Sequence, residues 1–158
     1  VIIRPTNNYG YFQYPEKFIP LTIKSLLRQQ KIVLHNGGTP VRSWLHIHDT
    51  SRAIQFILDN IDKCINQIFN IGGEEKTNFD IASSIVKIYK DLCQEDVDWS
   101  NIFDVVNYNR PGQDVRYAQS DAKLRQLGWQ PIMKLDEQLP LLVKQYIDNN
   151  ESLFNIKW

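Results

Sequence analysis

Short apolar, β-branched runs alternate along this chain with longer segments of helical period, and this alternation constrains the fold more than any other feature. The first run, Val1-Ile2-Ile3, is typical of a strand inside a larger sheet, and Pro5 ends it. Strands are predicted over residues 1–4, 31–35, 41–47, 68–71 and 104–107. Helices are predicted over residues 17–30, 49–58, 77–89, 120–127 and 135–149. Strands that alternate with amphipathic helices indicate an α/β fold.

Caps and prolines refine these helices. Asp49 can cap the second helix, and either Thr77 or Asn78 can cap the third, because their side chains accept hydrogen bonds from free backbone N–H groups. Pro20 fits only in the first turn of its helix. Pro140 fits poorly in the last helix unless that helix begins only a few residues earlier.

Composition excludes several classes of protein. The chain has 158 residues, enough for one domain with a hydrophobic core, and no apolar run approaches the roughly 20 residues that cross a bilayer. Lys+Arg and Asp+Glu balance at 18 each, so charge gives no reason to expect nucleic acid or an anionic membrane as a partner. Cys64 and Cys93 are expected to be buried, reduced thiols, which favours a cytoplasmic location. Because the chain starts with Val1, in the middle of a strand, we expect a fragment of a longer protein.

Polar side chains follow predicted strands or open predicted helices at five places. These are Asn7-Asn8, Lys17, Arg42, Asn78, and Asn109-Arg110 with Gly112. Each has a plain structural explanation, since asparagines form turns and caps and most surface cations are simply solvated. Together they favour an anion such as a diphosphate. Ligands bind outside the carboxyl ends of the strands in an open α/β sheet, and guanidinium, ammonium and amide groups all donate to phosphate oxygens.

Other chemistry has weaker support in the sequence. His46 and His48 would lie on one face of a strand, but no further Cys or His cluster accompanies them, so no metal site is predicted. The chain contains no G-x-S-x-G motif, and neither cysteine is followed by a suitable histidine. No catalytic residue is therefore assigned.

Five motifs occur in a specific order: "RPTNNYGYFQYPEKFIPL", "VRSWLHIHDTSRAI", "FNIGG…KTN", "NRPGQDVRY" and "KLRQLGW". Through them the chain resembles, over nearly its whole length, the nucleoside-diphosphate-glucose 4,6-dehydratases of the extended short-chain dehydrogenase/reductase superfamily. The dTDP-glucose enzymes are the nearest match. The "YPEKFIPL" segment argues against the related UDP-glucuronate decarboxylases.

The resemblance implies a fold and a function. The fold would be α/β, the C-terminal part of an extended Rossmann-type structure: a small substrate-binding domain plus the last strands of the cofactor domain, spanning residues 1–158. The parent protein would be a cytoplasmic, NAD-dependent lyase that converts dTDP-glucose to its 4-keto-6-deoxy derivative, in deoxysugar pathways such as rhamnose biosynthesis. It would be a homodimer.

The resemblance also assigns residues. Asn8 would contact the cofactor. Binding of the nucleotide-sugar would fall to Asn7, Lys17, Phe18, Val33, Leu34, His35, Arg42, Asn78, Asn109, Arg110, Pro111, Gly112, Gln113 and Tyr146. Within this set, Asn7 and Arg42 would face the diphosphate and Tyr146 would close the site.

Departures from the family leave alternatives open. Gln113 stands where the family usually has histidine, and Asn109 stands where it has aspartate. The glycine-rich NAD-binding turn, the Tyr-x-x-x-Lys pair and the Thr-Asp-Glu segment are all missing from the chain. The chain is therefore interpreted as the C-terminal half of a dehydratase, inactive by itself. A UDP-glucose 4,6-dehydratase, a non-catalytic nucleotide-sugar-binding fragment and a degenerate structural relative are the alternatives.

Overall fold

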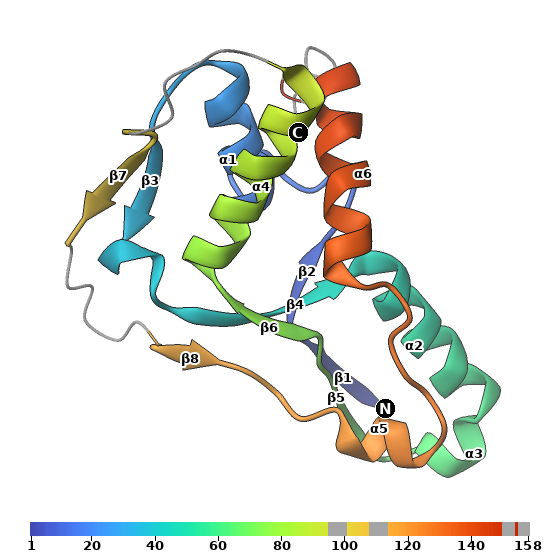
Figure 1. Ribbon diagram of the computed structural model, residues 1–158. Coiled ribbons are helices and arrows are strands. Elements are labelled where there is room, and N and C mark those ends of the chain that lie inside the picture. Colours follow the sequence, from blue (N-terminus) through green and yellow to red (C-terminus); the bar gives the residue numbers. More distant parts are fainter. Residues whose placement is uncertain (95–100, 108–113, 150–153, 155–158) are drawn as a thin grey trace.

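The computed structural model describes residues 1–94, 101–107, 114–149 and 154 of the chain (Figure 1). Its strands are β1 (Ile2–Pro5), β2 (Asn7–Tyr9), β3 (Ile32–His35), β4 (Val41–His46), β5 (Ile68–Ile71), β6 (Glu74–Thr77), β7 (Phe103–Val106) and β8 (Arg116–Tyr117). Its helices are α1 (Phe18–Leu27), α2 (Ile47–Asp59), α3 (Ile61–Cys64), α4 (Asn78–Cys93), α5 (Ala122–Gln126) and α6 (Leu135–Asp148), with a 3-10 turn at Asn36–Gly38. The predicted α/β fold is confirmed.

Strand β4 is the centre of the largest sheet. It pairs with β2 and β8 in parallel and with β6 in an antiparallel manner. Since β6 occupies one edge of β4, strands β2 and β8 follow each other along the opposite edge. Two further parallel pairs, β1–β5 and β3–β7, flank this sheet.

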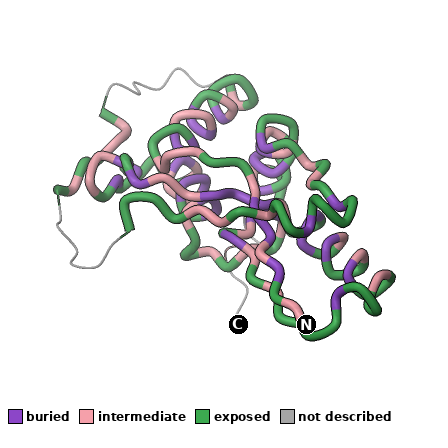
Figure 2. Tube along the Cα trace, turned by 90° about the horizontal axis from the view of Figure 1, so that it is seen from below, coloured by how far each residue is buried: buried purple, intermediate pink, exposed green. Residues whose placement is uncertain are grey.

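Two hydrophobic cores lie on either side of β4. Helices α1, α4 and α6 pack together over the larger core, and α2, α3 and α5 gather at the other end of the molecule beside β1 and β5 (Figure 1). Trp44 belongs to the larger core and its neighbour Leu45 to the smaller one, because successive residues of a strand point to opposite faces. Figure 2 shows the buried residues along this central strand and on the inner sides of the helices.

One helix start decides between two predicted caps, and another differs from prediction. Thr77, not Asn78, caps α4: its hydroxyl accepts from the Asp80 N–H (3.0 Å), while the Asp80 carboxylate accepts from the Thr77 N–H (3.2 Å). Asp49 does not cap α2, because the helix begins at Ile47 and the imidazole of His46 accepts from the His48 N–H (3.2 Å). The predicted strand face shared by the two histidines therefore does not exist.

The prolines and cysteines are placed as follows. Pro20 lies in the first turn of α1, as predicted, whereas Pro140 lies in the second turn of α6, where it removes one helical N–H donor. Cys64 is buried and unpaired, and Cys93 is also unpaired but only half-buried, so the prediction of a buried thiol is wrong for Cys93. No helix in the described part of the chain is long and apolar enough to cross a membrane.

Candidate functional site

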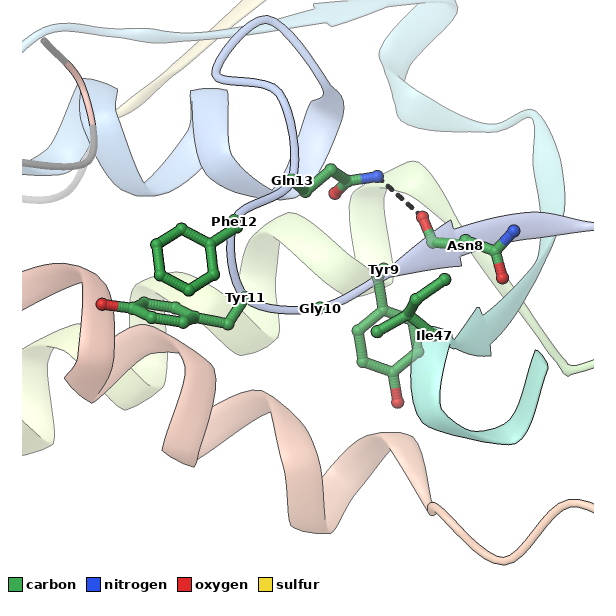
Figure 3. A pocket seen from close by; sticks show the side chains of 7 residues that line it. All are labelled: Asn8, Tyr9, Gly10, Tyr11, Phe12, Gln13 and Ile47. Carbon is green, nitrogen blue, oxygen red and sulfur yellow. Dashed lines mark hydrogen bonds between the residues drawn. The ribbon is translucent and has the colours of Figure 1, made fainter. Parts of the chain in front are cut away.

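An open pocket of about 220 Å³ lies at the carboxyl end of β2, where the chain leaves the sheet (Figure 3). It is lined by Asn8, Tyr9, Gly10, Tyr11, Phe12, Gln13 and Ile47. The first six belong to β2 and the loop after it, and Ile47 is the first residue of α2. The carboxyl ends of the parallel strands β2 and β4 therefore meet here, which is where an α/β sheet binds ligands.

The loop reaches its shape through a glycine. Gly10 has a φ of 155°, and a Cβ atom at this position would lie 2.7 Å from the Ile47 Cγ2 atom. Phe12, two residues later, adopts a φ of 62°, which is uncommon for a residue with a side chain. The pocket thus depends on a close approach of backbone to α2 that only glycine allows.

Amide groups set the polarity of the pocket. The Thr50 hydroxyl donates to Asn8 Oδ1 (2.5 Å), and Gln13 Nε2 donates to the Asn8 backbone carbonyl (2.7 Å; Figure 3 shows the second bond). Gln13 Oε1 and the Tyr9 hydroxyl are buried without a hydrogen-bond partner in the described part of the chain. Buried polar atoms of this kind are normally paired, so they suit a bound water or a ligand.

Burial and nearby charges shift the pKa values of two side chains, Tyr9 and His46. Burial raises the pKa of the Tyr9 phenol, and the charges of Glu74, Asp49 and Asp136 act in the same direction, so Tyr9 is a neutral donor at pH 7. Tyr9 contacts the His46 ring edge-to-face, with centroids 5.1 Å apart. Burial lowers the pKa of His46 despite the opposing charge of Asp49, so its imidazole is neutral as well.

Tyr146 reaches the pocket loop from α6. Its hydroxyl donates to the Gln13 carbonyl (3.4 Å), and its ring lies edge-on to Tyr11 with centroids 6.0 Å apart. The ring also stacks on Phe154 at 5.4 Å. Burial raises the pKa of Tyr146 to about 12. The predicted closing residue is therefore buried in the larger core and contacts the loop through Gln13 and Tyr11, without lining the pocket.

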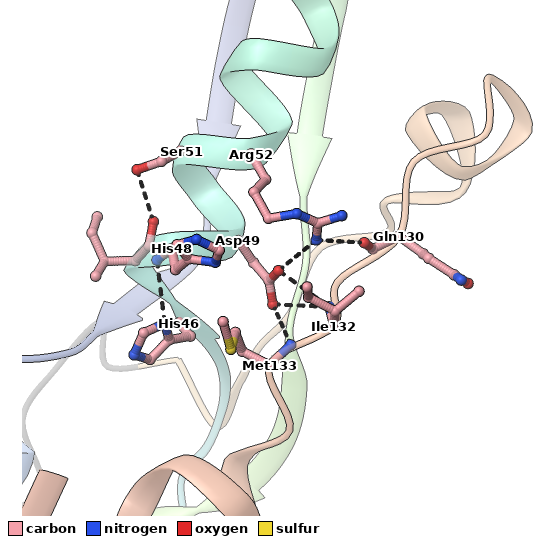
Figure 4. Close-up of polar contacts among 9 residues, drawn as sticks. His46, His48, Asp49, Ser51, Arg52, Gln130, Ile132 and Met133 are labelled. Carbon is pink, nitrogen blue, oxygen red and sulfur yellow. Dashed lines mark hydrogen bonds and ion pairs between the residues drawn. The ribbon is translucent and has the colours of Figure 1, made fainter. Parts of the chain in front are cut away.

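A buried carboxylate joins α2 to the segment that leads into α6 (Figure 4). Asp49 is fully buried and accepts hydrogen bonds from the backbone N–H groups of Ile132 (3.1 Å) and Met133 (2.9 Å). It also forms an ion pair with Arg52 (2.9 Å), which in turn donates to the Gln130 carbonyl (3.3 Å). The first turn of α2, which supplies Ile47 and Thr50 to the pocket region, is held in place by these bonds.

A second group of predicted residues lies at the other end of β4. Arg42 is the second residue of that strand and not part of a loop after it; its guanidinium donates to the carbonyls of Val41 (2.8 Å) and Asp114 (3.0 Å). The Asn78 N–H donates to the Pro40 carbonyl (3.3 Å). Four residues of strand, about 13 Å, separate Arg42 from the pocket end of β4. The structure thus places the predicted residues in two regions and not in one.

The remaining predicted residues have mixed positions. Lys17 is exposed at the start of α1, and Phe18 packs on Trp44 with ring centroids 6.1 Å apart. On β3, Val33 and His35 are exposed. The side chain of the neighbouring Leu34 is 1% exposed and belongs to the larger core. Asn7 is exposed and pairs with Trp44. Asn109, Arg110, Pro111, Gly112 and Gln113 lie outside the described residues.

Sequence reasoning missed several residues that the structure brings to these regions. Gln13 and Thr50 each donate a hydrogen bond to Asn8, and no local sequence pattern predicts these two bonds. Lys76 lies directly opposite Arg42 on β6, and opposed residues of paired strands project to the same face. Two neighbouring cations favour the binding of an anion between them. In the sequence, only the alternation along the short strand β6 could have indicated that Lys76 lies beside Arg42. Among the described residues no group of His, Cys, Asp and Glu could hold a metal ion.

Comparisons with known proteins give matches over almost the whole chain. Residues 1–72 match the NAD dependent epimerase/dehydratase family. A dTDP-glucose 4,6-dehydratase from Neisseria gonorrhoeae is 34% identical over a 155-residue alignment that covers 94% of this chain. The chain is thus similar to dTDP-glucose 4,6-dehydratases over almost its whole length. It spans about 44% of the length of that relative.

Solved structures show the same relationship. The dTDP-glucose 4,6-dehydratase of Bacillus anthracis, in complex with NAD, superposes with a TM-score of 0.81 at 32% identity, covering 94% of this chain and 44% of that one. The Streptomyces venezuelae enzyme, with NAD and TYD bound, gives a TM-score of 0.79 at 32% identity, covering 95% of this chain and 44% of that one. The predicted resemblance to the 4,6-dehydratases is confirmed.

The close approach at Gly10 leads to a prediction about stability. Gly10→Ala should destabilise the protein by about 2–4 kcal/mol, because the new methyl group collides with Ile47 and the backbone conformation becomes strained. Gly37→Ala is the matched control: Gly37 has a φ of 64° but open space around its Cα, so only strain of about 1 kcal/mol is expected. Urea unfolding measures both, and equal losses would contradict the collision.

A second prediction concerns the buried carboxylate. Asp49→Ala should destabilise the protein by about 3 kcal/mol, because it leaves the Arg52 guanidinium and two backbone donors without their acceptor. Asp59→Ala, which removes an exposed carboxylate from the same helix, should change the free energy of unfolding by less than about 0.5 kcal/mol. If the two variants unfold alike, Asp49 does not hold the two segments together.

Proposed function

We propose that this chain is the C-terminal, substrate-binding half of an NAD-dependent dTDP-glucose 4,6-dehydratase. The observation that carries the proposal is its similarity to these enzymes over 94% of its length, together with relatives of known structure that hold NAD and TYD. The chain itself lacks the glycine-rich turn that binds a dinucleotide diphosphate. By itself it is therefore expected to bind ligand weakly and to be catalytically inactive.

The pocket after β2 suits the nicotinamide end of the cofactor, and the region around Arg42 suits the nucleotide-sugar. Asn8, Gly10 and Gln13 form a pocket with aromatic walls and unpaired amide atoms, which fits an aromatic ring that carries an amide, such as the nicotinamide of NAD. In the proposed reaction NAD would accept a hydride from C4 of the sugar and return it at C6 after water is eliminated. The residues of this chain would orient the sugar and exclude water.

The Arg42 region suits the diphosphate and the nucleotide. Arg42 and Lys76 project to the same face of the sheet, and Lys76 has no ion-pair partner among the residues that the structure describes. Tyr117 lies opposite Arg42 on β8, and Asn78 follows Lys76 by two residues. Paired cations with nearby hydroxyl and amide donors match the charge and shape of a diphosphate. Asn7, Lys17, Phe18, Val33 and His35 remain predicted contacts of the nucleotide-sugar.

The cellular setting is part of the proposal. We propose a cytoplasmic location, which the two unpaired cysteines support because a reducing compartment keeps thiols free. The parent protein is proposed to be a homodimer that acts in deoxysugar biosynthesis. UDP-glucose is the alternative substrate, because Asn109 and Gln113 differ from the residues usual in the dTDP enzymes.

Calorimetric titration of the full-length protein with dTDP and with UDP tests the substrate class. We expect dTDP to bind at least about tenfold more tightly than UDP, because the curated relatives are dTDP-glucose enzymes. Tighter binding of UDP would transfer the proposal to a UDP-glucose dehydratase. A full-length protein that binds neither nucleotide would overturn it.

The diphosphate role of Arg42 leads to a kinetic prediction. Arg42→Ala in the full-length enzyme should raise the KM for dTDP-glucose by about 10–100-fold, because a charged hydrogen bond to phosphate is lost. Bound NAD should remain in place. Arg28→Ala, which removes an exposed arginine at the end of α1, is the control and should leave KM unchanged. Unchanged substrate kinetics in the Arg42 variant would remove Arg42 from the site.

A further inference from the structure

We propose that Thr50 is a positioning residue that fixes the orientation of the Asn8 carboxamide, so that Asn8 offers its NH2 group, and not its carbonyl, to the cofactor. This inference rests on the proposed function, in which Asn8 contacts NAD. Thr50 itself touches neither cofactor nor substrate in this view. It acts through one hydrogen bond, which joins α2 to β2 across 42 residues of sequence.

The Thr50 hydroxyl has a specific and unusual partner. Serine and threonine in a helix commonly donate to the carbonyl four residues earlier, and Ser51 does so, to Ile47 (3.1 Å). Thr50, the next residue back, donates instead to Asn8 Oδ1 on the neighbouring strand. Thr50 is 6% exposed, and a buried hydroxyl needs a partner because leaving it unpaired is costly. The bond to Asn8 is thus the way in which this hydroxyl is satisfied.

Once Oδ1 is occupied, the orientation of the Asn8 amide is determined. The two ends of a carboxamide have nearly the same shape, and only their hydrogen bonds distinguish them. No described residue accepts a hydrogen bond from Asn8 Nδ2. This nitrogen is also not one of the buried side-chain atoms that lack a hydrogen-bond partner. Asn8 is half-buried and lines the pocket, so its NH2 group is the end left available to a ligand.

Gln13 is oriented in the opposite sense, which makes the pair complementary. Its NH2 group donates to the Asn8 backbone carbonyl (2.7 Å), and its own carbonyl oxygen remains unpaired. The pocket is therefore lined by one amide whose NH2 group has no partner among the described residues and one whose carbonyl oxygen is unpaired but buried. The carbonyl of a ligand carboxamide can accept a hydrogen bond from the Asn8 NH2 group. Thr50 determines the donor half of this arrangement.

NAD retention by the full-length protein tests the inference. Thr50→Val, which keeps the shape and removes the hydroxyl, should raise the dissociation constant for NAD about tenfold, because the amide loses its preferred orientation. Thr50→Ser keeps the hydroxyl and should restore binding to within about twofold of the wild-type value. Ser51→Ala, which removes the neighbouring exposed hydroxyl, should have no effect. NAD released by denaturation, quantified by its absorbance, is the readout.

Two further variants separate orientation from general stability. In an Asn8→Ala background, Thr50→Val should cause no additional loss of NAD, since there is no amide left to orient. Asn8→Asp keeps an acceptor for Thr50 but has no NH2 group, so it should lose NAD as strongly as Asn8→Ala. This second variant tests the inference even if Thr50→Val does not fold.

The outcomes distinguish the inference from the proposed function. Suppose that the wild-type protein holds NAD. The role of Thr50 alone would be overturned if Thr50→Val bound NAD as tightly as the wild type, or if its loss of NAD affinity added to that of Asn8→Ala. Asn8→Asp that retains NAD as well as wild type would do the same. A wild-type protein that neither holds NAD nor dehydrates dTDP-glucose would overturn the proposed function and the inference together.

Discussion

The rest of the structure depends on the buried carboxylate of Asp49. A charge with no exposure to water is tolerated only when its acceptor positions are filled, and here Arg52 and the backbone of Ile132 and Met133 fill them. These bonds fix the first turn of α2 against the segment that enters α6. The same turn carries Ile47 and Thr50, so the shape of the pocket and the hydrogen bond to Asn8 both follow from the position of Asp49.

Strand β4 separates the two polar regions while keeping them rigid with respect to each other. Arg42 stands at its amino end, beside β6 and β8, and the pocket stands at its carboxyl end, beside β2. An ion or a small metabolite could occupy only one of these regions. A nucleotide-sugar together with a dinucleotide is long enough to use both, which is why the separation supports the proposed function instead of weakening it.

The sequence predicts the long helices and the apolar strands well, because their periodicity is local: α1, α4 and α6 and strands β1, β3 and β5 lie close to their expected ranges. It does not predict β2, β6 or β8, which are short and polar and form only because β4 offers them hydrogen bonds. The alternation along β3, with Leu34 buried between the exposed Val33 and His35, is a local pattern of the same kind. The roles of Gln13, Thr50 and Lys76 depend on contacts between distant segments, and no pattern along the chain reveals them.

Trp44 and Leu45 project into different hydrophobic cores, and this difference favours the correct register of β4 during folding. A slip by one residue would reverse both faces at once, sending the indole into the smaller core and the leucine into the larger one. The first error overfills a space and the second leaves a void, so the misaligned strand is penalised twice. Asn7 pairs with Trp44 and Asn8 with Leu45. The register of β4 therefore also determines which face of the sheet each asparagine side chain projects from.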